Sequence, residues 1–250
     1  MDSQYFDVQA WYRTPLGEML AGLEDNHTEV ILSNLFGYHI LQLCGDKNYL
    51  SSARVKNKVL ITRNANSSLK NKSLLAKASA LPIATDSVDI VVLPHTLEIS
   101  DRPHEVLREV ERVLIAEGRI VIMGFNPWSL VGMRRLLSWR SLQFPWCSQF
   151  ISLPRVTDWL TLLGFEVEEC RRHFFIVPFQ SRAMMSQHKW VESVGKKIWP
   201  FFSGAYILVA KKRVSTITPI RPRWGAHSLV ASDAVEVSVR MGNKTQKVKP

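Results

Sequence analysis

The sequence has little cysteine, no long hydrophobic run and no targeting signal at its start. Its 250 residues include three cysteines, Cys44, Cys147 and Cys170, and no pair has the Cys-x-x-Cys spacing of redox or zinc motifs. This argues against a disulfide framework and favours a reducing, cytoplasmic compartment. No apolar run approaches the roughly 18 residues of a membrane-spanning helix. The first residues lack the basic and apolar regions of a secretory signal peptide.

Positive charge is abundant, but it is concentrated at one end of the chain. The formal net charge is +10, and the stretch from Lys211 to Pro250 has nine Lys and Arg residues against two Asp and Glu. That stretch therefore carries +7 and leaves +3 for residues 1–210. The pattern of a packed core is lost after Arg213, so we expect 214–250 to form a basic tail that is either disordered or adds one edge strand around Val235, Val237 and Val239. Such a tail favours contact with nucleic acid or an acidic partner.

Helical and strand patterns alternate through the rest of the chain. Residues 1–37 are expected to form an N-terminal helical segment, which Thr14 and Pro15 begin as cap and first-turn proline. Strands are expected at His39–Cys44, Lys58–Thr62, Leu74–Ala78, Val88–Leu93, Arg119–Gly124, Phe165–Arg171 and Ala205–Lys211. Further helices are expected from Ser100 to Gly118, near Trp128–Leu137 behind an Asn126–Pro127 cap, and over Pro154–Leu163. Apolar strands that alternate with helices predict a parallel sheet covered on both faces.

Residues 80–124 contain an ordered set of motifs. A Leu81-Pro82 turn, Val88-Asp89 at a strand start, a Leu97-Glu98 pair, the helix Glu109 to Leu114, Gly118 and the strand Ile120–Met123 follow one another. This order resembles class I S-adenosylmethionine-dependent methyltransferases of the ubiquinone/menaquinone-methyltransferase-like type. The stretches Leu-Pro-His-Thr-Leu-Glu and Gly-Phe-Asn-Pro also resemble a bacterial branch of such proteins. The resemblance implies a Rossmann-like α/β domain over 38–213, with a seven-stranded, mostly parallel sheet whose last strand is antiparallel.

The same resemblance implies that S-adenosylmethionine lies across the ends of strands one, two and four. The implied cofactor-binding residues are Gln42, Gly45, Asp46, Thr62, Ala78, Leu81, Pro94 and His95. Three positions depart from the family. A single glycine, Gly45, remains where the family has a glycine-rich loop after strand one. At the end of strand two, Thr62 is present without the Asp or Glu that the family usually has there. Lys77 takes the place of the Asp that usually binds the adenine. Two alternatives stay open: the cofactor binds through altered contacts, or its binding has been lost.

His95, directly after the fourth strand, is the candidate catalytic residue. Its reference pKa of about 6.5 suits a general base near neutrality. The alternative is a histidine that only hydrogen-bonds a neighbouring loop. Glu98 either contacts substrate or pairs with a helix start or an arginine. No His and Cys cluster has metal-ligand spacing, so no metal site is expected.

Two function classes follow from these observations. The first is a cytoplasmic methyltransferase that acts on a small molecule or RNA, with the aromatic and basic insert 172–204 as a substrate lid. The second is a methyltransferase-fold binding protein without catalysis, whose basic tail contacts RNA or an acidic partner. A membrane-surface enzyme is the least favoured class, since it depends on the aromatic insert and on family analogy alone.

Overall fold

The computed structural model describes residues 11–44, 47–62, 73–137, 145, 148–175 and 203–214. The chain divides into two units, Met1–Ser215 and Thr216–Pro250, and every described residue lies in the first. The predicted basic tail therefore lies outside the described residues, apart from Val214. The same holds for 176–202, which make up most of the predicted insert 172–204.

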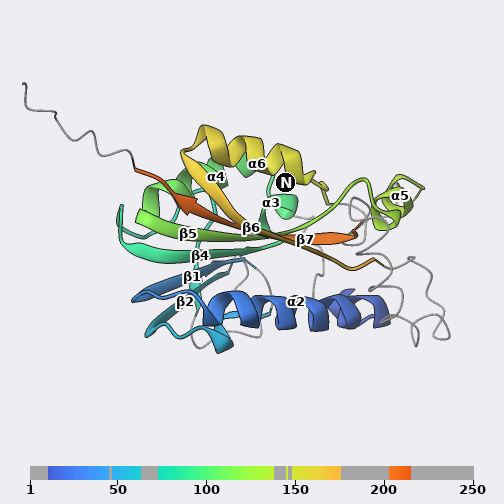
Figure 1. Ribbon diagram of the computed structural model, residues 1–250, viewed down its shortest axis with the longest axis horizontal. Helices are drawn as coiled ribbons and strands as arrows, with labels where there is room; N and C mark the ends of the chain where they lie inside the picture. Colours follow the sequence, from blue (N-terminus) through green and yellow to red (C-terminus); the bar gives the residue numbers. More distant parts are fainter. Residues whose placement is uncertain are drawn as a thin grey trace, which may run out of the picture. The chain divides into compact units, whose positions relative to one another are not determined.

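A seven-stranded sheet forms the centre of the first unit (Figure 1). Its strands are β1 (His39–Leu43), β2 (Asn57–Thr62), β3 (Ser73–Leu75), β4 (Val88–Pro94), β5 (Leu114–Phe125), β6 (Phe165–His173) and β7 (Ala205–Lys212). Their order across the sheet is β3-β2-β1-β4-β5-β7-β6. Strands β1 to β5 pair in parallel, and β7 is antiparallel to both neighbours. The predicted seven-stranded, mostly parallel α/β fold is confirmed.

Helices cover both faces of this sheet (Figure 1). Helix α2 (Pro15–Ser33) and the 3-10 turn η1 (Leu50–Ser52) pack on one face, where Ile31 and Leu32 meet Ile90 and Val92 of β4. The other face is covered by α3 (Thr96–Ile99), α4 (Pro103–Val113) and α6 (Leu153–Leu162). A shorter helix, α5 (Leu130–Leu137), follows β5. Within the described ranges, no helix combines the length and the apolar character that a membrane crossing requires.

Helix α2 begins where the sequence predicts. Thr14 has extended backbone, its hydroxyl accepts the amide of Gly17 (3.2 Å), and Pro15 occupies the first turn. A side-chain cap of this kind satisfies one of the amides that a helix start leaves unpaired. The first turn is therefore fixed locally, before any tertiary contact is considered.

The end of α4 differs from the prediction. The helix ends at Val113, and Gly118, expected to terminate it, lies inside strand β5. A Cβ on Gly118 would lie 2.9 Å from the carbonyl oxygen of Ile115 and 3.1 Å from that of Asp89. Glycine is required there by the close approach of two strands at an irregular point in the β4–β5 register. A glycine that permits close packing was misread as a helix stop.

The start of α5 also differs from the prediction. The Ser129 hydroxyl accepts the amide of Gly132 (3.0 Å), so Ser129 caps this helix. Asn126 instead accepts the amide of Trp128 (3.1 Å) in the turn that leaves β5. Asn and Ser are both common helix caps, so the sequence alone does not decide whether Asn126 or Ser129 caps α5.

The connections differ between the two halves of the sheet. Two helices, α3 and α4, connect β4 to β5, and two more, α5 and α6, lie between β5 and β6. Between β1 and β2 the described residues contain only the turn η1. The crossover to β2 is thus close to the shortest length that joins parallel strands.

Candidate functional site

The carboxyl ends of β1, β4 and β5 are tied together around His95. The Thr96 hydroxyl donates to the carbonyl oxygen of Leu43 at the end of β1 (2.6 Å). The His95 amide donates to the carbonyl oxygen of Met123 in β5 (3.1 Å). His95 has a φ of 49°, a left-handed conformation that turns the chain sharply out of β4 and into α3. The strand order reverses between β1 and β4, which is where open α/β sheets bind ligands.

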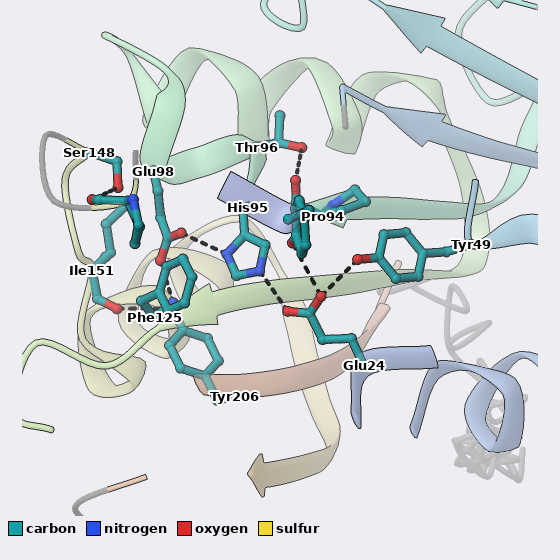
Figure 2. A network of polar contacts seen from close by, with 12 residues as sticks. Glu24, Tyr49, Pro94, His95, Thr96, Glu98, Phe125, Ser148, Ile151 and Tyr206 are labelled. Carbon is teal, nitrogen blue, oxygen red and sulfur yellow. Dashed lines mark hydrogen bonds and ion pairs between the residues drawn. The ribbon is translucent and has the colours of Figure 1, made fainter. Parts of the chain in front are cut away.

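The His95 side chain lies between two carboxyl groups (Figure 2). Its Nδ1 is 2.8 Å from Oε2 of Glu98, and its Nε2 is 2.7 Å from Oε1 of Glu24 in α2. The exposed fractions of the three residues are 2%, 3% and 0%. The ring of Phe125 stacks on the imidazole with 4.4 Å between centroids. An imidazole that faces a carboxylate on each side donates from both nitrogens only when it is protonated.

The electrostatics of this cluster agree with its geometry. Burial lowers the pKa of His95, but Glu24 and Glu98 outweigh burial and raise it to about 10. Burial raises the pKa of Glu24, while His95 and Tyr49 lower it further than burial raises it. For Glu98 burial prevails over His95 and the Phe125 amide, so its pKa is raised. The Glu24–His95–Glu98 cluster therefore holds an imidazolium between two carboxyl groups.

Two tyrosines complete the hydrogen bonding of Glu24. The Tyr49 hydroxyl donates to Oε2 of Glu24 (2.7 Å), and the Tyr12 hydroxyl donates to the same oxygen (3.2 Å). Burial, and next the charge of Glu24, raise the pKa of both hydroxyls well above its usual value, so both remain donors. On the other side of His95, Glu98 accepts the backbone amide of Phe125 with Oε1. Each carboxylate oxygen in the cluster thus faces a donor, as buried charges require.

Glu24 was missed by the sequence analysis, although the sequence contains a signal for it. The buried positions of α2 recur every three or four residues, at Leu16, Leu20, Glu24, Thr28 and Ile31. An acidic residue on the apolar stripe of an amphipathic helix needs a buried partner. The partner, His95, lies 71 positions away along the chain. The helical spacing therefore identifies Glu24 as a buried acidic residue, but it does not identify His95 as its partner.

Gln42, predicted to bind the cofactor, holds the loop that follows β1. Its side chain is fully buried, its Nε2 donates to the carbonyl oxygen of Lys47 (2.6 Å), and its Oε1 accepts the amide of Tyr49 (3.0 Å). Lys47 in turn pairs with Asp25 of α2 (2.5 Å). The loop is thereby fastened both to β1 and to α2. The other two residues predicted there, Gly45 and Asp46, lie outside the described residues.

The remaining predicted cofactor residues fall in two places. Thr62 ends β2 and is buried, and Pro94 ends β4 beside His95. Ala78 and Leu81 instead pack against the core beneath α4. The Leu81 amide donates to Glu109 of α4 (2.8 Å). Pro94 and His95 therefore lie together at the end of β4, whereas Ala78 and Leu81 lie apart from them, packed against the core beneath α4.

The chemistry of the described residues fits one end of the expected cofactor. At the end of β4, two carboxyl groups surround a single imidazolium, and their oxygens already face donors within the fold. At the end of β2, the Thr62 hydroxyl has the chemistry to bond a ribose hydroxyl. No carboxylate stands at that end among the described residues. Within the same ranges, no group of three or more side chains could hold a metal ion.

Comparisons with known proteins agree with this fold. Residues 32–122 match a family model described as a methyltransferase domain. The uncharacterized protein YafS of Escherichia coli (strain K12) is 30% identical over 210 residues, which cover 83% of this chain and 82% of YafS. The family match includes Gln42, His95 and Glu98, while Glu24 and His173 lie outside it.

Solved structures with the same architecture come from several organisms. A SAM-dependent methyltransferase of Thermotoga maritima, a possible histamine N-methyltransferase, gives a TM-score of 0.59 at 15% identity and covers 82% of this chain and 94% of its own. A putative methyltransferase of Haloferax volcanii, in complex with the Trm112 methyltransferase activator, gives 0.57 at 14% identity, with 83% and 98% covered. Geranyl diphosphate C-methyltransferase of Streptomyces coelicolor gives 0.55 at 15% identity, with 82% and 88% covered. These likenesses show the fold, and the different acceptors named show that the fold does not fix the acceptor.

Proposed function

Because the chain is related to YafS, matches a methyltransferase-domain model over residues 32–122 and has the fold of S-adenosylmethionine-dependent methyltransferases, we propose that it binds S-adenosylmethionine and methylates a small molecule or RNA. The observation that carries the proposal is the Glu24–His95–Glu98 cluster at the point where the strand order reverses. Buried, strongly perturbed ionisable groups concentrate at functional sites. The ubiquinone-like branch remains a prediction from motif order alone.

The proposed cofactor site lies over the carboxyl ends of β1, β2 and β4. Bound there, S-adenosylmethionine supplies a methyl group on a positively charged sulfur. Thr62 would hold the ribose end, and the backbone of Pro94 and His95 would form the wall beside the methionine end of the cofactor. Gln42 would act through the loop that it fixes, which contains Gly45 and Asp46. Backbone atoms near Ala78 and Leu81 remain the proposed contacts for adenine.

His95, the predicted catalytic residue, does not act as a general base in this proposal. A general base must be free to accept a proton, and His95 already carries one, since its pKa is raised to about 10. Glu24 is not free either, because both of its oxygens already face donors within the fold. We therefore assign His95 and Glu24 a positioning role beside Pro94.

A binding titration tests the proposal. Isothermal titration of the full chain with S-adenosylmethionine should give saturable binding. At about 100 times Kd the cofactor should stabilise the fold by about 2.7 kcal/mol. His95→Gln should weaken binding, whereas His104→Gln, a change at an exposed residue of α4, should leave it unaltered. The absence of binding by the unmodified chain at millimolar cofactor would overturn the proposal.

A second candidate function is favoured by the shortened cofactor half of the sheet. Among the described residues, the β1–β2 crossover contains only the turn η1, and Gln42 fastens the loop where the family has glycines. A methyltransferase-fold protein that binds RNA or an acidic partner through residues 214–250 would need no cofactor. Binding by such a basic segment should fall steeply with salt and vanish when 214–250 are deleted. Salt-independent binding, or binding that survives the deletion, would exclude this candidate.

The expected location and lid belong to the same proposal. We place the protein in the cytoplasm, because its three cysteines lie far apart in the sequence and no pair has Cys-x-x-Cys spacing. The insert 172–204 is the proposed substrate lid, and its two described ends, 172–175 and 203–204, lie at the carboxyl edge of the sheet. Removal of 178–200 should therefore change acceptor binding more than cofactor binding.

A further inference from the structure

A second buried histidine lies at the same edge of the sheet as His95. His173 is the last residue of β6, pairs with Ala205 of β7, and is fully buried. Its ring lies 5.2 Å, centroid to centroid, from the ring of His27 in α2. Glu24 and His95 are both close enough to influence its charge. Helix α2 therefore contacts both histidines, His95 through Glu24 and His173 through His27.

Both ring nitrogens of His173 are buried and have no hydrogen-bond partner. The hydroxyl of Thr28, one turn beyond Glu24 on the buried side of α2, is likewise buried and unpartnered. The backbone of Arg171 lies near the ring and favours its protonation slightly, but it does not meet hydrogen-bond geometry. Buried polar atoms without a partner are rare in proteins, and each of them needs an explanation, such as a functional role or a water, ion or ligand that binds there.

The charge state of His173 limits what that group can be. Burial is the main cause that lowers the pKa of His173 to about 3; the charge of Glu24 raises this pKa, while the interactions with His27 and His95 lower it. The ring is therefore neutral, with one nitrogen that donates and one that accepts. Thr28 adds a hydroxyl that can do either. These three atoms match a neutral group that both donates and accepts hydrogen bonds.

The neighbouring charged groups are already paired with one another. Glu24 faces His95 with one oxygen and the hydroxyls of Tyr49 and Tyr12 with the other. An anionic ligand would meet the Glu24 carboxylate, and a cationic ligand would meet the His95 imidazolium without a free carboxylate oxygen to bind. The arrangement therefore disfavours ligands of either sign.

We propose that Thr28 and His173 form the polar end of the methyl-acceptor site, and that the acceptor presents a neutral hydroxyl or amide there. The proposal rests on the proposed function, because the acceptor must lie next to the site assigned to the cofactor. His173 ends β6, which lies on the opposite side of β4 from β1 and β2 in the strand order. Thr28 comes from α2, whose Ile31 and Leu32 pack with residues of β1, β2 and β4. The polar end of the acceptor would therefore lie on the β6 side of the cofactor.

Four matched probes test this directly: phenol and benzamide, which are neutral, and benzoate and benzylammonium, which are charged. The full chain, labelled with ¹⁵N and saturated with S-adenosylhomocysteine, would be titrated with each probe while the His173 ring nitrogens are followed by NMR. Phenol or benzamide should shift these signals with a millimolar Kd, and the charged probes should bind at least tenfold more weakly. Equal binding by a charged probe would overturn the proposal. Ring signals that none of the four moves would indicate an internal water only, and would overturn it too.

Two variants and two matched controls complete the test. His173→Phe and Thr28→Val should each weaken the neutral probe at least tenfold, read for the variants by calorimetry. His104→Phe on α4 and Thr161→Val on α6 make the same changes at exposed residues and should not. If the Phe variant fails to fold, the near-isosteric Val variant decides, and unchanged probe binding there contradicts the proposal. Cofactor titration of the same samples separates the two ideas: loss of cofactor binding by the unmodified chain defeats the proposed function, whereas intact cofactor binding without probe binding defeats only this inference.

Discussion

His95 and His173 both lie against helix α2 and are both buried, but they differ in their hydrogen-bond partners and in the direction of their pKa shifts. His95 has a carboxyl group on each nitrogen, and its pKa is raised to about 10. His173 has no partner on either nitrogen, and its pKa is lowered to about 3. Burial acts on both rings in the same direction, against the charged form. The difference comes entirely from what each ring faces.

This contrast separates two uses of a buried polar group. The charge on His95 is compensated within the fold, so the Glu24–His95–Glu98 cluster ties α2 to the ends of β4 and β5 without any ligand. The groups of His173 and Thr28 are uncompensated, so the fold alone gives no reason to keep them. A change at the first set should therefore cost stability, and a change at the second set should cost binding.

The largest effect is expected when the paired histidine is removed. His95→Leu leaves two buried carboxyl groups facing each other without a counter-charge. Loss of one partner from a buried ion pair typically costs about 3–5 kcal/mol. Urea denaturation of the full chain measures this, with His104→Leu as the exposed control. A loss below about 1 kcal/mol would show that the cluster is not the anchor of α2.

Opposite pH dependences should follow for the two histidines. The folded-state pKa of His95 is raised, so its contribution to stability is complete below about pH 6.5, the usual value for histidine, and is lost as pH rises toward 10. The folded-state pKa of His173 is lowered, so the unfolded chain binds the extra proton, and stability is lost as pH falls from about 6.5 toward 3.

Urea titrations at a series of pH values isolate each contribution as wild type minus variant. For one proton the limiting slope is about 1.4 kcal/mol per pH unit. The difference between wild type and His95→Gln should shrink above neutrality. The difference between wild type and His173→Phe should change only on the acid side. A wild-type curve that stays parallel to both variants would remove the charge assignment of both rings.

The sequence predicts the strands and helices that carry the two histidines, but it does not predict the contacts that the histidines make. Short apolar runs give the strands, and apolar residues at helical spacing give α4, because those signals are local. His95 is found because it follows a buried strand inside a motif-rich stretch. Its partner Glu24 is not found, since nothing local links residues 71 positions apart. The role of His173 is missed for the same reason.

Errors in the predicted boundaries have a similar origin. Gly118 predicts a helix stop, but it lies inside β5, close to the backbone oxygens of Ile115 in the same strand and Asp89 in β4. The contact with β4 joins residues that are distant in sequence, and nothing in the immediate neighbourhood of Gly118 shows it. The carboxylate on the apolar stripe of α2 is the exception, because its burial could have been inferred from periodicity.

A smaller loss is expected when the outer bond of the charged cluster is removed. Tyr49→Phe deletes the hydroxyl that donates to Glu24 at 2.7 Å and keeps the ring. Hydrogen bonds to charged groups contribute about 1.5–3 kcal/mol. The variant should lose stability in that range, and its alkaline pH dependence should remain, because His95 still faces both carboxyl groups. Thermal and urea melts at pH 7 and pH 9 check both statements, and loss of the alkaline dependence would place the proton on a different group.

The smallest effect, and the one with the opposite sign, is expected at Thr28. Thr28→Val replaces a buried, unpartnered hydroxyl with a methyl group of nearly the same shape. Because an unsatisfied buried hydroxyl costs about 1–3 kcal/mol and its removal leaves no new orphan, the ligand-free protein should gain up to about 1 kcal/mol. Thr161→Val on the exposed side of α6 should instead be neutral within about 0.5 kcal/mol. If Thr28→Val destabilises the protein by more than about 0.5 kcal/mol, the Thr28 hydroxyl already has a hydrogen-bond partner in the folded protein. The surroundings of His95 and His173 would then differ only in the charge of the two rings.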